Sequence, residues 1–143
     1  MTRKSELVLE ALFGVLQGID GPKVLRNAIL PERVPAPGII ILRDGEPGEP
    51  EALMSPPEYI YEHFAEAEVV VDAPTSAQRD SIFDGLLEAI GTAIAANRTL
   101  GGLCDYVLPA APEPAELAIE GAPGFKAAII SIALHYGTAD PLA

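Results

Sequence analysis

Three glutamates in an alternating stretch are the first candidates for chemistry in this chain. Glu62, Glu66 and Glu68 lie in residues 58–73, EYIYEHFAEAEVVVDA. A strand places every second residue on the same face, so the three carboxylates share one side. Paired carboxylates could perform acid–base catalysis or hold a metal ion. Their neighbours on that face are apolar, namely Ile60, Phe64 and Val70. Such a mixed surface favours a face that meets water or another subunit.

Histidine and cysteine are scarce: the chain has His63, His135 and Cys104. Alternation places His63 on the face opposite the glutamates, which excludes a His/Glu metal cluster on one strand face. Two histidines without spaced aspartate or cysteine partners are too few for a zinc site. Cys104 could be a nucleophile paired with a distant histidine. However, GGLCDYV is typical of the entry to a strand, and we interpret Cys104 as a small buried hydrophobe.

Glycine and proline mark the remaining candidates. Gly101–Gly102 and the segment 18–21 lack phosphate-loop patterns, so we interpret them as helix ends. We therefore predict no catalytic, cofactor-binding or metal-binding residue. Two acidic loops are stiffened by proline, RDGEPGEPE (43–51) and PAAPEPAE (109–116). They present carboxylates at a small ordering cost, which fits either a contact surface for basic partners or simple solvated turns.

Two helices and several strands must position these residues. An apolar stripe predicts a helix over 5–19. Thr75 and Gln78 predict a capped second helix over 75–98, ended by Gly101 and Gly102. Residues 20–37 contain four prolines, and we interpret them as a connector with one helical turn at 23–28. The predicted strands are 38–44, 51–55, 58–73, 103–108 with a continuation at 117–119, and 125–136.

The order of these elements predicts the fold class. Tight loops at 45–50 and 121–124 favour antiparallel pairing. The runs GIIILRD (38–44) and FKAAIISIALHY (125–136) are apolar on both faces, as expected of strands covered on both sides. We predict one α+β domain over residues 1–143. It has a mixed or antiparallel sheet of about four to five strands, with two helices packed on one face, in the order α-β-β-α-β-β.

Composition excludes several classes of function. The 143 residues carry 21 acidic and 9 basic side chains, a net charge of -12. This charge argues against direct nucleic-acid binding and against an anionic membrane surface. A single cysteine excludes an intrachain disulfide and fits a reducing compartment. No apolar run is long enough to span a membrane, and Glu6 and Glu10 interrupt the N-terminal apolar stretch, which argues against a signal peptide.

Several passages of the chain form a recognisable series: the RDGEPGEPE turn before YIYEHFAEAEVVV, then TLGGLCDYVLP, and the closing FKAAIISIALHYGTADPLA. In these passages, in its length and in the order of its elements, the whole chain resembles the tail terminator and tail-completion proteins of long-tailed bacteriophages and gene transfer agents. The resemblance implies a non-enzymatic virion protein without a cofactor. Such proteins form a hexameric ring that caps the head-proximal end of the tail tube, ends its polymerisation and joins the tail to the neck.

The implied partners are further copies of the chain, the tail tube protein and neck or connector proteins. The implied location is the virion tail or neck, with assembly in the host cytoplasm. An adaptor or stopper protein of the head–tail connector is the first alternative, because such proteins share the small α+β plan. A small enzyme that uses Glu62, Glu66 or Glu68 with a histidine is the alternative from a different class. A ring needs two different surfaces on each subunit, which a sheet edge, a helix flank and protruding loops could supply.

Overall fold

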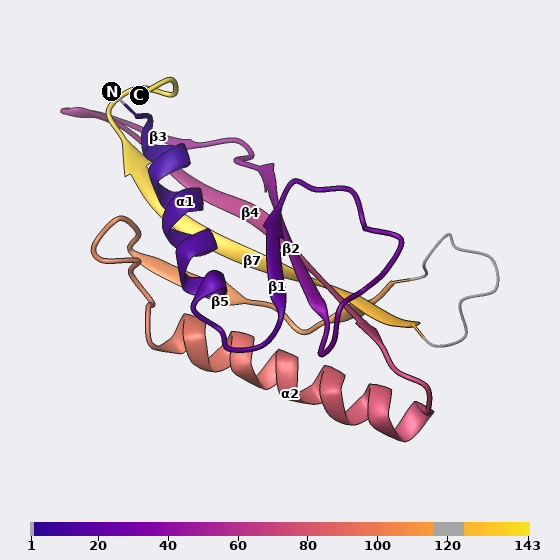
Figure 1. Cartoon of the computed structure of the whole chain (residues 1–143). Coiled ribbons are helices and arrows are strands. Elements are labelled where there is room, and N and C mark those ends of the chain that lie inside the picture. Colours follow the sequence, from indigo (N-terminus) through magenta and orange to yellow (C-terminus); the bar gives the residue numbers. More distant parts are fainter. Residues whose placement is uncertain (1, 116–124) are drawn as a thin grey trace.

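A computed structural model describes residues 2–115 and 125–143 as two helices packed on one face of a mixed β-sheet (Figure 1). The helices are α1 (Lys4–Gln17) and α2 (Ser76–Ala95). The strands are β1 (Lys23–Arg26), β2 (Ile39–Glu46), β3 (Glu51–Met54), β4 (Pro57–Asp72), β5 (Tyr106–Pro109), β6 (Glu113–Pro114) and β7 (Phe125–Thr138). The predicted α+β class is confirmed.

The two longest strands, β4 and β7, pair antiparallel along the middle of the sheet, from Tyr59 to Asp72 of β4. On the other edge of β4, β2 and β3 pair one after the other. On the far edge of β7, β5 and β6 do the same. Strand β1 extends the sheet by pairing with β2 in parallel. The seven strands therefore fill five positions across the sheet.

Two predictions about the sheet are wrong. It has seven strands where about four to five were predicted. The described elements follow the order α-β-β-β-β-α-β-β-β, which differs from the predicted order. The two strands that were not predicted are β1 and β6, which lie in segments interpreted as a connector and a loop. They have four and two residues, too few to show a clear period in the sequence.

Strand β1 replaces the helical turn that was predicted at 23–28. Its residues pair with Ile39 to Leu42 of β2. Val24 packs against the main core and Leu25 against a smaller cluster on the other face. The unpaired edge of β2 and apolar contacts on both faces thus outweigh the local preference of this segment. Asn27 follows with φ 51°, a left-handed conformation that ends the strand.

The second half of the chain also departs from prediction in detail. Helix α2 ends at Ala95, before the predicted end at 98, and β5 begins at Tyr106 instead of residue 103. Strand β6 lies within the segment predicted as the loop 109–116 and pairs with Ile129 and Ala128 of β7. The predicted strand continuation at 117–119 and the tight loop at 121–124 lie outside the described residues.

Alternation along β4 divides the sheet into a helix-facing side and an outer side. The odd-numbered residues from Tyr61 to Val71 are buried beneath the helices, as the alternating pattern predicted. Leu12 and Leu16 of α1 and Ile90 and Ile94 of α2 belong to the same core. Gly38 shows how tightly α2 packs on the sheet, because a Cβ there would lie 2.9 Å from Leu86 Cδ1.

Candidate functional site

The three glutamates lie on the outer side of β4, and His63 lies on the other side, as alternation predicted. Glu62 and Glu66 are exposed, while Glu68 is partly buried, with an oxygen 3.9 Å from Arg43 Nη2. Among residues 2–115 and 125–143, no group of three or more His, Cys, Asp or Glu side chains is placed to hold a metal ion. The glutamates form an acidic sheet surface in which an arginine is the nearest counter-charge.

His135 forms a second polar cluster on the outer side. Its Nδ1 lies 2.7 Å from Asp105 Oδ2, and its ring stacks on Tyr106 with 4.7 Å between the ring centroids. An aspartate–histidine pair is a familiar orienting device for a general base. Within the described residues, however, no hydrogen bond joins His135 to a serine, threonine or cysteine side chain. The contact with Asp105 and the stacking on Tyr106 therefore hold these two residues and His135 together at the sheet edge.

Cys104 precedes Asp105 but faces the helical core, with 5% of its surface exposed. Burial raises the pKa of its thiol to about 11. A thiol with a raised pKa is a poor nucleophile at neutral pH, since the thiolate is the reactive form. The structure confirms the prediction that Cys104 is buried.

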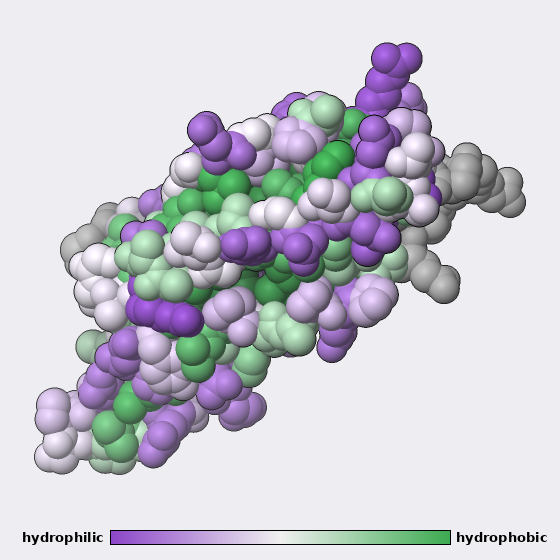
Figure 2. Space-filling view, turned by 90° about the horizontal axis from the view of Figure 1, so that it is seen from below, coloured by the Kyte–Doolittle hydropathy of each residue, from purple (hydrophilic) through white to green (hydrophobic). Residues whose placement is uncertain are grey.

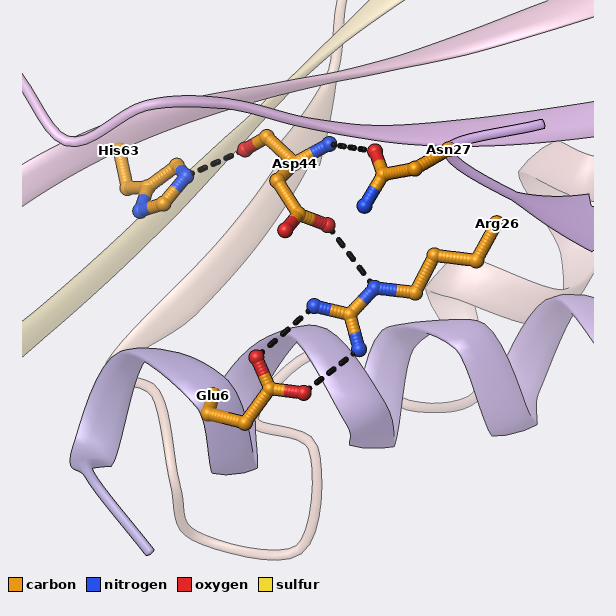
Figure 3. Close-up of polar contacts among 5 residues, drawn as sticks. All are labelled: Glu6, Arg26, Asn27, Asp44 and His63. Carbon is orange, nitrogen blue, oxygen red and sulfur yellow. Dashed lines mark hydrogen bonds and ion pairs between the residues drawn. The ribbon is translucent and has the colours of Figure 1, made fainter. Parts of the chain in front are cut away.

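A polar network that the sequence did not reveal connects α1, β1 and β2 (Figure 3). Two nitrogens of Arg26 donate to the carboxylate of Glu6 at 2.7 and 2.9 Å. The third, Nε, donates to Asp44 Oδ1 at 2.8 Å. The backbone N–H of Asp44 donates to Asn27 Oδ1 at 3.1 Å. Arg26 thus ties the first helix to the sheet through two carboxylates.

The electrostatics of this network follow from its hydrogen bonds. The hydrogen bond from Arg26 holds the pKa of Glu6 below its ordinary value. Burial by itself raises the pKa of Asp44, but the hydrogen bond from Arg26 and its positive charge outweigh burial and lower that pKa. The same two carboxylates raise the pKa of the Arg26 guanidinium. All three groups therefore stay charged at neutral pH.

The network continues to two buried rings. Since a carbonyl oxygen only accepts, His63 Nε2 must donate to the backbone oxygen of Asp44 at 2.6 Å. In the neutral imidazole, Nδ1 then accepts from the Tyr136 hydroxyl at 2.9 Å. Burial raises the pKa of Tyr136 to about 12, so the hydroxyl keeps its proton. Both nitrogens of His63 are satisfied, which makes it a structural residue of the helix-facing side.

The acidic segment 43–51 is a bulge whose geometry depends on glycine, and the predicted tight loop at 45–50 is wrong. Strands β2 and β3 both pair antiparallel with β4, so the chain continues along one edge of β4 and does not reverse. The register between β2 and β4 shifts between Arg43 and Glu46. Gly45 sits in this bulge with φ 67°, and a Cβ there would collide with the carbonyl group of Phe64. Residues 45–49 are exposed. Of the second acidic loop, 109–115 is described, and its backbone stays close to β7 through β6 and through the bond from Ala115 N to Ala127 O at 3.0 Å.

Strands β3 and β4 form a hairpin that extends beyond the helices, at the end of the molecule where both chain ends lie (Figure 1). All four residues of β3 are exposed, including Leu53 and Met54, the latter at 78%. Neither side chain belongs to the two hydrophobic clusters of the described residues. The hairpin is the feature that the sequence identified only as a short strand.

Residues 2–115 and 125–143 cover the outer side of the sheet at one end only. Residues of the 27–38 segment pack with Ile39, Ile41 and Val70 there. Toward the hairpin, large apolar side chains are exposed, Phe64 at 47% and Leu108 at 49%. We call this uncovered part the bare face; its outward residues include apolar and polar side chains, namely Glu51, Leu53, Glu58, Ile60, Glu62, Phe64, Glu66, Tyr106, Leu108, Ala133 and His135.

No family model matches the chain, and no curated protein matches it significantly. None of the described helices is long and apolar enough to cross a membrane.

Proposed function

We propose that this protein is a structural subunit of a phage-type tail, a terminator that forms a ring at the head-proximal end of the tail tube. In this role it ends tube polymerisation and joins the tail to the neck. The observation that carries the proposal is the bare face with its projecting hairpin. Leu53, Phe64 and Leu108 are exposed on one side of one sheet. Exposed apolar side chains gathered on one surface favour contact with another protein.

A ring subunit needs two different complementary surfaces, because a head-to-tail interface joins one side of each copy to the other side of the next. The bare face and the β3–β4 hairpin supply one. The two outer strands of the sheet path, β1 and β5, supply edges on opposite sides that no other described strand pairs with. The resemblance to tail terminators adds the expectation of six copies, with the tail tube protein below the ring and neck proteins above it.

The charge of the chain sets conditions on assembly. Each copy carries -12, and the bare face contains Glu62 and Glu66. Copies therefore repel one another at low ionic strength, and a Debye length of about 10 Å at 0.1 M leaves neighbouring subunits within range. Assembly should strengthen as salt is added, or when a basic surface of a tail tube or neck protein is present.

Sedimentation velocity and native mass spectrometry across a salt series test the ring. The expected result is a discrete oligomer of about six copies, favoured by salt. Phe64→Glu should disperse it, because a charge would be placed at the centre of the apolar contact. Ile29→Glu is the matched control, since Ile29 is 91% exposed and lies outside the bare face. A strict monomer at high salt and high concentration, with and without a tail tube protein, would contradict the proposal.

The proposed role is structural, not enzymatic. One other role in the virion would suit a protein of this kind. An adaptor or stopper of the head–tail connector would use the same fold and a similar ring. The two roles differ in partner, because a terminator binds the end of a tail tube, whereas an adaptor or stopper binds connector rings. Electron microscopy of the protein mixed with tail tubes therefore separates them, since a terminator should sit at one end of each tube.

A further inference from the structure

The helical side of the molecule is hollowed by a cleft between α1 and α2, with a volume of about 920 Å³. Figure 2 looks onto the α2 side and shows hydrophobic surface interrupted by hydrophilic side chains. The cleft is lined mostly by small and apolar residues, among them Gly14, Val15, Gly85, Ala89, Ala93 and Leu100. This surface is separate from the bare face, because both helices lie on the other side of the sheet.

Two glycines in the helices keep this cleft open. Gly14 lies inside α1 and Gly85 inside α2, where glycine weakens a helix relative to alanine. A Cβ added at either position meets nothing within 4 Å, so no contact within the described chain requires a glycine there. Glycine at such positions allows another backbone to approach closely. The space above Gly85 is therefore suited to a tightly packed partner segment.

The dimensions of the cleft suit a helix. Along α2 it extends from Gly85 to Ala93, and a rise of 1.5 Å per residue makes this length about 12 Å. A second helix laid along it would contact the cleft over about eight residues, or roughly two turns. Helices recognised in grooves bind through apolar residues that recur at helical spacing on one face.

The charged side chains of the cleft indicate which kind of helix would bind there. The charged side chains that line it are Asp20 and Glu88, and both are acidic. A second copy of this chain would bring further negative charge, since each copy carries -12. We propose that the cleft binds one amphipathic helix of a different, basic protein. The small apolar face of that helix packs over Gly85 and Ala89, and its lysine or arginine side chains lie beside Asp20 and Glu88.

A synthetic peptide provides the probe. We would use a capped helix of leucine, alanine and lysine, with the apolar residues at helical spacing, and a permuted peptide of identical composition that lacks this spacing. Fluorescence anisotropy of the labelled peptides would measure binding to the full chain. The amphipathic peptide is expected to bind at least about ten-fold more tightly than the permuted one. Equal affinity would overturn the proposal, because attraction between opposite charges alone would explain it.

Two pairs of variants locate the site. Gly85→Leu should weaken binding about ten-fold or more by filling the cleft. Gly91→Leu is its control, because Gly91 lies in the same helix, has equally open space around its Cβ and does not line the cleft. Glu88→Gln should weaken binding about two- to five-fold, as expected for an exposed ion pair. Asp84→Asn, one turn away and outside the cleft, removes the same charge and should change affinity less.

The outcomes separate this proposal from the ring. Loss of peptide binding in Gly85→Leu and retention in Gly91→Leu supports the cleft, whatever the oligomeric state. Unchanged binding in Gly85→Leu, with equal effects of Glu88→Gln and Asp84→Asn, would overturn it. A self-association of the wild-type chain that Gly85→Leu abolishes would also overturn it, because the occupant would then be a second copy. Glu88→Gln keeps the test decisive if the leucine variant folds poorly.

Discussion

Replacing Ile90 by alanine should strongly destabilise the protein, because Ile90 anchors α2 on the sheet. Its side chain is 1% exposed and belongs to the main core. The substitution removes three carbon atoms, and about 0.8 kcal/mol for each buried methylene makes a transfer loss of about 2.4 kcal/mol. The cavity left behind adds a further cost, so we expect about 3–4 kcal/mol in total. Stabilities of about 5–15 kcal/mol are usual, so this loss is a large share.

A substitution on the exposed face of α2 should instead stabilise the protein. Gly85 is exposed, and a Cβ added there meets nothing within 4 Å. Gly85→Ala should therefore raise stability by about 0.5–1 kcal/mol through helix propensity. Urea denaturation of wild type, Ile90→Ala and Gly85→Ala measures both changes, provided that the slope of unfolding free energy against urea stays constant. A loss below about 0.5 kcal/mol in Ile90→Ala would show that another face of α2 meets the sheet.

Three further predictions concern titration, thiol reactivity and catalysis. The pKa of Glu6 is lowered from 4.5 by Arg26, so this pair stabilises the fold above that pH and loses its effect as pH falls through the lower, folded value. Glu6→Gln should cost about 0.5–1 kcal/mol at pH 7 and nothing at strongly acidic pH; denaturation curves at several pH values would show a constant difference if this reasoning were wrong. Alkylation of Cys104 at pH 8 should be about a hundred-fold slower in the native protein than in urea, and equal rates would contradict its burial. Any turnover detected should persist after single replacement by glutamine, and a large loss in one variant would indicate a catalytic carboxylate; the positions are Glu62, Glu66 and Glu68.

The parts of the fold with a long period were predictable from the sequence. The burial of β4 alternates from Tyr61 to Val69, so the assignment of His63 and Glu62 to opposite faces needed no structure. Helix α2 carries its start signal in the sequence, and Thr75 Oγ1 accepts from the N–H of Gln78 at 3.2 Å as predicted. In both elements many residues follow one period of apolar and polar positions, so a single exception does not hide the pattern.

Strands β1 and β6 and the polar network were not predictable in the same way. Strand β6 has two residues, and it forms through backbone pairing with the edge of β7. Arg26 meets Glu6 and Asp44, which lie 20 and 18 residues away in the chain. Such contacts depend on the register of β1 against β2 and on the position of α1, and neither leaves a local signal. Charged residues in an acidic chain look alike in sequence whether they are paired or solvated.

The two proposed surfaces respond to salt in opposite directions, and this follows from the charge of the chain. Contacts between copies bring together surfaces that each belong to a molecule of charge -12, so screening should strengthen them. A basic helix is attracted to Asp20 and Glu88, so screening should weaken its docking in the cleft. A single salt series, followed by sedimentation and by peptide anisotropy, therefore distinguishes the two. If both interactions changed in the same direction, the charge argument for at least one surface would be wrong.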